Sequence, residues 1–256
     1  MKYLAVFVLL CSSICNAGTI DPNIPDSRYI KYGSEYACVL KIRGIYADKL
    51  NSGFAASCVI IDRYHVLTAA HIVENSITQH VLFENKAYPC AVIAIHIKYD
   101  SKIYGKHDIA IARLQTPIDL DFYPELYDKK DEQGKVCGIA GWGISGNFNT
   151  GIKKESYDNI RRAGSNVIAE IEHNMLITKV DDRPKTELEF LIGSGDSGGG
   201  LFIDKKVAGI NSCVLSIDGK ADSSRRDMGG HTRVSDYIGW IKEAKKSIAK
   251  IIENEK

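Results

Sequence analysis

The pentapeptide Gly195-Asp196-Ser197-Gly198-Gly199 sets a serine hydroxyl among glycines. Glycine has no side chain, so the backbone N–H of Gly195 can approach a substrate oxygen, and the two later glycines leave room for a substrate. The N–H groups of Gly195 and Ser197 can then converge on one point and form an oxyanion hole. A glycine-rich turn is the alternative interpretation of the motif alone. Ser197 becomes a nucleophile only if a histidine and a carboxylate stand where they can activate it.

Two upstream segments supply candidates for those partners. His71 follows an apolar strand-like stretch and the small residues 68–70, which let other chain segments pack beside its ring. Asp108 precedes the alternating apolar run 109–114, where an aspartate is either a turn residue or a buried acceptor for an imidazole nitrogen. As an acceptor it fixes the histidine tautomer and stabilises the imidazolium. The residue types therefore permit a triad of Ser197, His71 and Asp108.

The order His71, Asp108, Ser197 along the chain is the order found in chymotrypsin. The segments around the three residues resemble those of the trypsin-like (chymotrypsin-fold) serine proteases. The resemblance covers roughly residues 30–243 and includes three further segments: the Gly-Trp-Gly stretch 137–143, the stretch 209–212 that follows the nucleophile, and the closing stretch 230–241.

This resemblance implies an all-β fold of two six-stranded antiparallel β-barrels with the active site in the cleft between them. His71 and Asp108 would come from the first barrel and Ser197 from the second. The resemblance also implies that Ser212 hydrogen-bonds Asp108. It further implies that Asp196 is a buried structural latch, paired with a positive group that holds the oxyanion loop in shape.

Period-two apolar patterns agree with an all-β fold, because short strand-like runs recur with turn residues between them. These runs are 37–42, 57–61, 81–83, 91–97, 109–114, 135–140, 166–171, 188–191, 200–203, 206–211 and 231–234. We expect the first barrel over about residues 30–125 and the second over about 126–235. Apolar residues then recur at helical spacing, which predicts a C-terminal α-helix over about 236–253, docked on the second barrel.

Residues 1–17 have the pattern of a secretory signal peptide, with Lys2, an apolar run and the small residue Ala17. We expect cleavage after Ala17 and a secreted or periplasmic protein. Residues 18–29 are then an N-terminal segment and a candidate short propeptide, and 30–256 form the peptidase domain. The apolar run is too short to span a bilayer, so we expect no membrane association after the signal is removed.

The positive partner of Asp196 is an open question at this point. In the family, a cut before an Ile-Val-Gly-Gly-like start frees an ammonium that pairs with this acid. Ile30 stands where that start would fall, but Tyr29 precedes it instead of a basic residue. The alternatives are a cut before Ile30, a cut after Arg28, or no cut and another cation beside Asp196.

The resemblance also locates a substrate pocket at Leu191, Ser212, Val214 and His231. Leu191 lies six residues before Ser197, where trypsin has an acidic pocket base, so a preference for Arg or Lys is disfavoured. Val214 replaces a glycine of the family and should narrow the entrance. We expect small or medium apolar side chains to bind. Recognition of an acidic side chain by His231 is the alternative.

Removal of residues 1–17 leaves an odd number of cysteines, so at least one is unpaired within the chain. Ile72 and Gly193 stand where the family has cysteines of the histidine loop and the pocket, so both of those bridges should be absent. We expect mostly buried free thiols, with Cys38–Cys90 as the one candidate bridge. The spacings fit no zinc site, and we expect no metal or other cofactor.

The charges nearly cancel, with 33 Lys and Arg against 32 Asp and Glu. This balance gives no field that would attract nucleic acid or an acidic membrane. We therefore predict a monomeric, secreted serine endopeptidase that hydrolyses proteins or peptides through an acyl-enzyme. A catalytically silent binding module on the same fold is the main alternative. An esterase is a second one, although residues 201–203 after Ser197 have the pattern of a strand and not of a helix.

Overall fold

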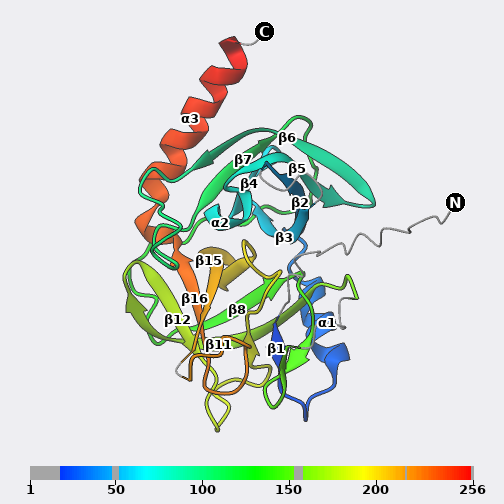
Figure 1. The fold of residues 1–256 in the computed structure, drawn as a ribbon, viewed down its shortest axis with the longest axis vertical. Helices are drawn as coiled ribbons and strands as arrows, with labels where there is room; N and C mark the ends of the chain where they lie inside the picture. The colour runs from blue at the N-terminus through cyan, green and yellow to red at the C-terminus, as the bar shows by residue number, and fades with distance from the viewer. Residues whose placement is uncertain (1–17, 48–51, 153–157, 217, 255–256) are drawn as a thin grey trace, which may run out of the picture.

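The computed structural model describes residues 18–47, 52–152, 158–216 and 218–254. Two closed six-stranded antiparallel barrels lie one above the other in Figure 1, as the sequence predicted. The first barrel closes in the order β2-β3-β4-β7-β6-β5. Its strands are β2 (Val39–Tyr46), β3 (Gly53–Ile60), β4 (His65–Thr68), β5 (Ser76–Phe83), β6 (Lys86–Ile95) and β7 (Ala110–Leu114).

The second barrel closes in the order β11-β12-β16-β15-β14-β8. Each barrel buries its inward-facing branched side chains, such as Ile42 and Ile111 in the first and Ile139 and Leu201 in the second. The strands of the second barrel are β8 (Val136–Gly141), β11 (Arg162–Glu172), β12 (Met175–Lys179), β14 (Gly200–Ile203), β15 (Lys206–Leu215) and β16 (Met228–Arg233).

The N-terminal segment packs on the side of the molecule that contains the second barrel. Strand β1 (Thr19–Ile20) lies in a small sheet of order β10-β9-β1-β13, with β9 (Gly146–Asn147), β10 (Gly151–Ile152) and β13 (Phe190–Leu191). Helix α1 (Asp26–Ser34) packs against β11 and is fixed there by an ion pair between Asp26 and Arg162 at 2.6 Å. The helix therefore runs through residue 30, where the sequence placed the boundary of the peptidase domain, and it packs on the second barrel.

The C-terminal helix α3 (Ile238–Asn254) follows the short turn η1 (Val234–Asp236). Its predicted docking on the second barrel is wrong, because the helix crosses over to the first barrel and packs on β6 and β7 (Figure 1). Ile241, Ala244 and Ile248 face that barrel's core, and Lys245 pairs with Asp62. The helix thereby joins the end of one barrel to the flank of the other.

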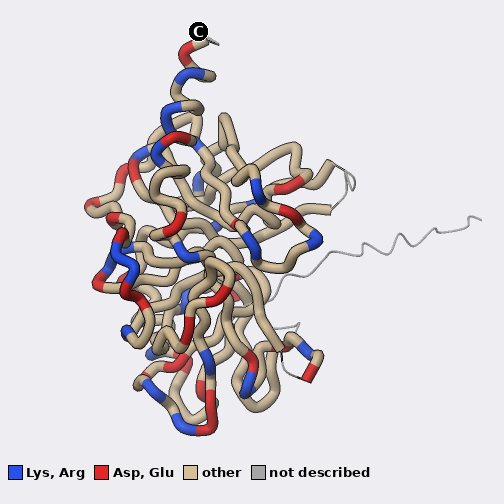
Figure 2. The backbone as a smooth tube through the Cα atoms, turned by 90° about the vertical axis from the view of Figure 1, so that its left-hand side faces the viewer, with Lys and Arg blue, Asp and Glu red and all other residues tan. Residues whose placement is uncertain are grey.

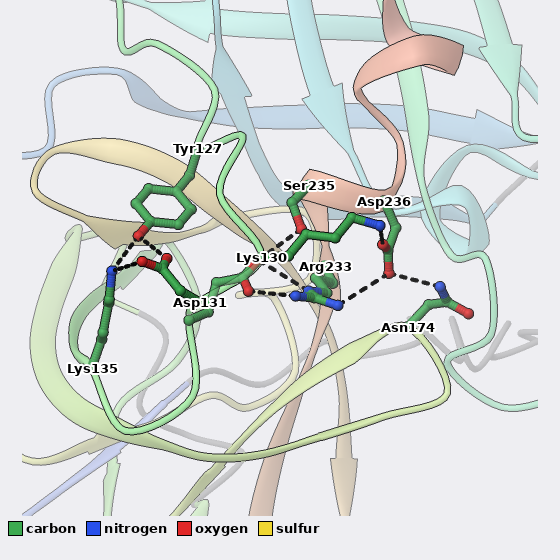
Figure 3. A network of polar contacts seen from close by, with 9 residues as sticks. Tyr127, Lys130, Asp131, Lys135, Asn174, Arg233, Ser235 and Asp236 are labelled. Atoms are coloured by element: carbon green, nitrogen blue, oxygen red, sulfur yellow. Dashed lines mark hydrogen bonds and ion pairs between the residues drawn. The ribbon is translucent and has the colours of Figure 1, made fainter.

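A polar network fixes the segment between the barrels where the chain turns into α3 (Figure 3). The buried Glu132 accepts hydrogen bonds from the guanidinium of Arg233, at 2.6 and 3.0 Å, and from the hydroxyl of Ser235 at 2.7 Å. Lys130 and Asn174 donate to Asp236 beside them. Because Glu132 is fully buried, these charged and hydroxyl partners offset the cost of burying its carboxylate.

The predicted Cys38–Cys90 bridge is wrong. Every cysteine that the structure describes is free, and Cys90 alone among them is not fully buried. Burial raises the pKa of the Cys38 thiol to about 11 and that of the Cys90 thiol to about 12, so both stay protonated at neutral pH.

Figure 2 shows Lys and Arg interspersed with Asp and Glu along both barrels. In the part of the chain that the structure describes, no helix has the length and apolar character needed to cross a membrane.

Candidate active site

His71 lies in α2 (Ala70–Val73), a single turn that follows β4. The buried alanines 69 and 70 allow this turn to sit close against neighbouring segments. The backbone N–H of His71 donates to Asp108 Oδ1 at 2.9 Å, and its ring Nδ1 contacts Asp108 Oδ2 at 2.7 Å. The carboxylate thus fixes both the backbone and the ring of His71. Of the two ring nitrogens, Nε2 is the one left to accept or donate a proton elsewhere.

Asp108 is buried two residues before β7 and accepts hydrogen bonds from three donors. Besides the two groups of His71, the hydroxyl of Ser212 donates to Asp108 Oδ2 at 2.6 Å. Burial by itself would raise the pKa of Asp108, but the hydrogen bonds from His71 and Ser212 outweigh it and hold the pKa below its ordinary value. Asp108 therefore stays ionised at neutral pH and can stabilise a positive charge on His71.

Residues 195–199, here called the serine loop, form the second part of the connection from β13 to β14. Within the described residues, three of the loop's five backbone N–H groups have partners: Asp196 donates to Gly193, Gly198 to Asn211 and Gly199 to Asp196. The N–H groups of Gly195 and Ser197 have none. Gly195 has a φ of +91°, which a residue with a side chain rarely adopts. The two free donors are those that an oxyanion hole would use.

Asp196 is fully enclosed beneath the serine loop. Its carboxylate accepts hydrogen bonds from the backbone N–H groups of Gly193 at 3.1 Å, Gly143 at 3.2 Å and Gly18. Among the described residues no lysine, arginine or histidine side chain forms an ion pair with it. Burial raises the pKa of Asp196 to about 6 despite the three donors.

Ser197, His71 and Asp108 all line one cleft of about 600 Å³ between the barrels. In the described part of the chain, no hydrogen bond joins the hydroxyl of Ser197 to His71. A hydrogen bond between nucleophile and base often forms only when substrate is bound. Ser197 and His71 are therefore kept as the candidate nucleophile and base. The first barrel contributes His71 and Asp108, and the second contributes Ser197 and residues 212–214.

The predicted pocket residues divide into two groups. Ser212 and Val214 line the cleft, together with Ile192 and Ala221, which the sequence did not single out. Leu191 is not part of that lining. It pairs with Thr19 across the small sheet and packs against other buried apolar side chains. The side chain after it, Ile192, faces the cleft because successive residues of an extended chain point to opposite sides.

His231 is buried in β16 with both ring nitrogens engaged. Its Nε2 lies 3.1 Å from the hydroxyl of Thr178, and its Nδ1 lies 2.9 Å from Asn211 Oδ1. Burial lowers the pKa of His231 to about 3, so the ring is neutral. A neutral, buried histidine that already has two partners is poorly suited to bind an acidic side chain.

The family model described as Trypsin matches residues 36–241 of this chain. The chain belongs to the trypsin family. The match includes the candidate triad, both barrels and the start of α3. It begins after β1 and α1, both of which lie outside the matched residues.

Three curated proteins illustrate what this trypsin-family chain is similar to. A chymotrypsin of Phaedon cochleariae is 30% identical over 203 residues, which are 71% of this chain and 69% of the relative. The snake venom serine protease PTLE1 of Gloydius halys is 26% identical over 75% of this chain and 78% of its own. The thrombin-like enzyme elegaxobin-2 of Protobothrops elegans is 24% identical over 77% and 87%.

A solved structure titled HL collagenase has the same fold. It superposes with a TM-score of 0.65 at 19% identity and covers 82% of this chain and 94% of its own. In the described residues of the present protein, no three His, Cys, Asp or Glu side chains gather as metal ligands do.

Proposed function

We propose that the protein is a serine endopeptidase that cleaves peptide bonds with Ser197, His71 and Asp108. The observation that carries this proposal is the state of the serine loop: of its five backbone N–H groups, only those of Gly195 and Ser197 have no partner among the described residues, and they lie beside an aspartate-bound histidine in the same cleft. A chain that kept the fold only for binding would have no need of this arrangement.

The chemistry follows from the roles of these groups. The hydroxyl oxygen of Ser197 attacks the substrate carbonyl carbon, while Nε2 of His71 takes the hydroxyl proton. The carbonyl oxygen becomes an oxyanion between the N–H groups of Gly195 and Ser197. His71 then protonates the leaving amine as the C–N bond breaks, which leaves an acyl-enzyme. Water activated by His71 hydrolyses that ester, and Asp108 stabilises the imidazolium in both steps.

A fluorophosphonate that phosphonylates activated serines tests the proposal directly. We expect one label per chain, at Ser197, together with cleavage of peptide amides. Absence of labelling in folded protein would favour the silent binding module. Labelling with turnover of small esters but of no peptide would favour the esterase.

We propose that the pocket prefers small or medium apolar side chains. Ile192 and Val214 line it, and the side chain of Val214 occupies space at its wall. The hydroxyl of Tyr104 donates to the carbonyl of Val214 at 3.4 Å and narrows the cleft further. A cleavage profile dominated by Arg, Lys or Glu would contradict this preference.

Replacing Val214 with glycine should widen the pocket. We expect kcat/KM for a large aromatic side chain to rise by about tenfold relative to alanine, since a few methylene groups in a pocket are worth about that much. The matched control is Val136→Gly, because Val136 is 61% exposed outside the cleft. Peptide-library profiling of both variants checks the result, and an unchanged profile for Val214→Gly would count against Val214 as a pocket wall.

We also propose that the exported chain starts at Gly18 and needs no cut near residue 28. Gly18 is buried, its carbonyl accepts from Gly146 at 3.2 Å, and its N–H donates to Asp196. A β-carbon at Gly18 would lie 2.1 Å from the ring of Phe190, so this close approach requires glycine. If signal peptidase cuts after Ala17, this same nitrogen becomes an ammonium beside an otherwise unpaired carboxylate.

The two alternative cuts, after Arg28 or before Ile30, fit the structure less well. Arg28 and Ile30 lie inside α1, and Tyr29 between them is fully buried. A cut there would also separate β1, and Gly18 with its hydrogen bond to Asp196, from the rest of the chain.

A form of the protein that retains Ala17 should be less stable than one starting at Gly18 when the pH is high. Without the ammonium, the pKa of Asp196 stands at about 6, above its ordinary 3.8. A carboxyl whose pKa is raised on folding does not oppose folding below pH 4, where it is protonated in both states. As the pH rises through 6, the free energy of unfolding falls by about 3 kcal/mol. The ammonium removes this loss, so the gap between the two melting temperatures should widen from pH 4 to pH 8.

Equal stability and equal activity of the two forms at pH 8 would contradict the pairing of the Gly18 ammonium with Asp196. N-terminal sequencing of the active exported protein that finds Tyr29 or Ile30 first would contradict a start at Gly18. Size-exclusion chromatography of the same material tests the expected monomer.

A further inference from the structure

Ser57 is a fully buried residue of β3 in the first barrel, and it contacts the serine loop of the second. Its backbone N–H donates to the carbonyl of Ser197 at 2.9 Å. Its hydroxyl donates to the carbonyl of Gly195 at 2.8 Å and accepts the backbone N–H of Trp142 at 2.9 Å. One residue therefore binds the serine loop at two carbonyls, on either side of Asp196.

These contacts direct the carbonyls of the loop away from substrate. An oxyanion hole requires N–H groups in the cleft, and a carbonyl that turned into the cleft would repel the oxyanion. The carbonyl of Gly195 is the one most free to rotate, because Gly195 has no side chain and a φ of +91°. Its bond to the buried hydroxyl of Ser57 opposes that rotation.

The same hydroxyl connects this carbonyl to the support of Asp196. Trp142 is anchored by its ring N–H, which donates to the carbonyl of Val39 at 2.8 Å. The next residue, Gly143, donates to Asp196 Oδ1 at 3.2 Å. Ser57 thus closes a ring of contacts in which one strand of the first barrel binds both the loop and the segment that holds its buried acid.

We propose that Ser57 is a positioning residue for the oxyanion hole, holding the Gly195 carbonyl so that the N–H groups of Gly195 and Ser197 face the cleft. The inference rests on the proposed protease function. A hydroxyl fits this place because it donates one hydrogen bond and accepts another at once. Alanine, the residue at the neighbouring position 56, can do neither.

The test compares Ser57→Ala with Ser235→Ala. Ser235 is also buried and its hydroxyl also makes a hydrogen bond, but to Glu132 in the network of Figure 3 and not in the cleft. For each variant we would measure the melting temperature, kcat and KM for a peptide amide, and inhibition by a peptidyl boronic acid, which forms a tetrahedral adduct on the serine.

For Ser57→Ala we expect kcat to fall by about 10- to 100-fold with KM within about threefold, since misplacing one oxyanion donor costs in this range or more. The boronic acid should weaken by a similar factor. Ser235→Ala should lower the melting temperature but keep kcat within about threefold. If Ser57→Ala does not fold, Ser57→Cys replaces it, because a thiol of similar size is a weaker donor and acceptor.

Two outcomes are distinguishable failures. An active parent protein whose Ser57 variants keep kcat and boronic acid affinity would overturn the role of Ser57 alone. A folded parent protein that neither reacts with fluorophosphonate nor cleaves peptides would overturn the proposed function, and the role of Ser57 with it.

Discussion

Replacing Ser197 with alanine is expected to lower kcat for a peptide amide by about six orders of magnitude, with little change in KM. The alanine keeps the loop, its backbone donors and the pocket, but it removes the oxygen that forms the acyl bond. Activity that survives would come from the oxyanion hole and substrate binding alone. Single-turnover kinetics and mass spectrometry of the acyl-enzyme provide the measurement.

Ser194→Ala is the matched control, because Ser194 is another serine hydroxyl in the lining of the same cleft. This variant should still react with fluorophosphonate. If Ser197→Ala kept its label and its turnover, another residue would be the nucleophile, and the proposed function of the serine loop would be wrong.

The second large effect is expected for Asp108→Asn, which should lower kcat by about four orders of magnitude. Asp108 accepts hydrogen bonds from the ring Nδ1 and the backbone N–H of His71, at 2.7 and 2.9 Å. An amide group presents a donor where one of these acceptors was. The ring of His71 would then favour the tautomer with its proton on Nε2, and this nitrogen would no longer accept the proton of Ser197.

The chain supplies a matched control for this change. Asp62 contacts Nδ1 of His65 at 2.8 Å, also in the first barrel but beside α3 and outside the cleft. Asp62→Asn should lower stability and leave kcat within about threefold. Equal losses of kcat in the two variants would mean that Asp108 acts on the fold and not on His71.

The sequence predicted most strands because inward-facing apolar residues alternate along them, but it missed β12. The hairpin that joins β11 to β12 turns at His173 and Asn174, whose φ angles are +49° and +66°. Such turns usually carry glycine, and its absence here hid the turn. Helix α1 was missed for a different reason: it is short and mostly polar, and its position depends on the contact of Asp26 with Arg162 far along the chain.

The site residues also divide into those that a local sequence motif reveals and those whose role depends on contacts between distant segments. His71, Asp108 and Ser197 stand out because each lies in a local motif whose residue types suit one chemical role. Ser57 has no such motif, since its role depends on Gly195 and Trp142, which are distant in sequence. Gly18 follows directly after the predicted signal cleavage site. The signal pattern predicted a new chain end there, but it did not indicate that the N–H of Gly18 donates to Asp196.

The amino-acid sequence by itself determined the family, the all-β architecture and the three candidate catalytic residues, because these depend on local patterns and on their order along the chain. The tertiary structure alone decided that α3 packs on the first barrel, that Ile192 and not Leu191 faces the cleft, and that Ser57 holds the serine loop. These depend on which side of a strand each side chain occupies and on contacts between segments far apart in sequence. Burial and hydrogen-bond partners are properties of the closed fold, so they could be obtained only from it.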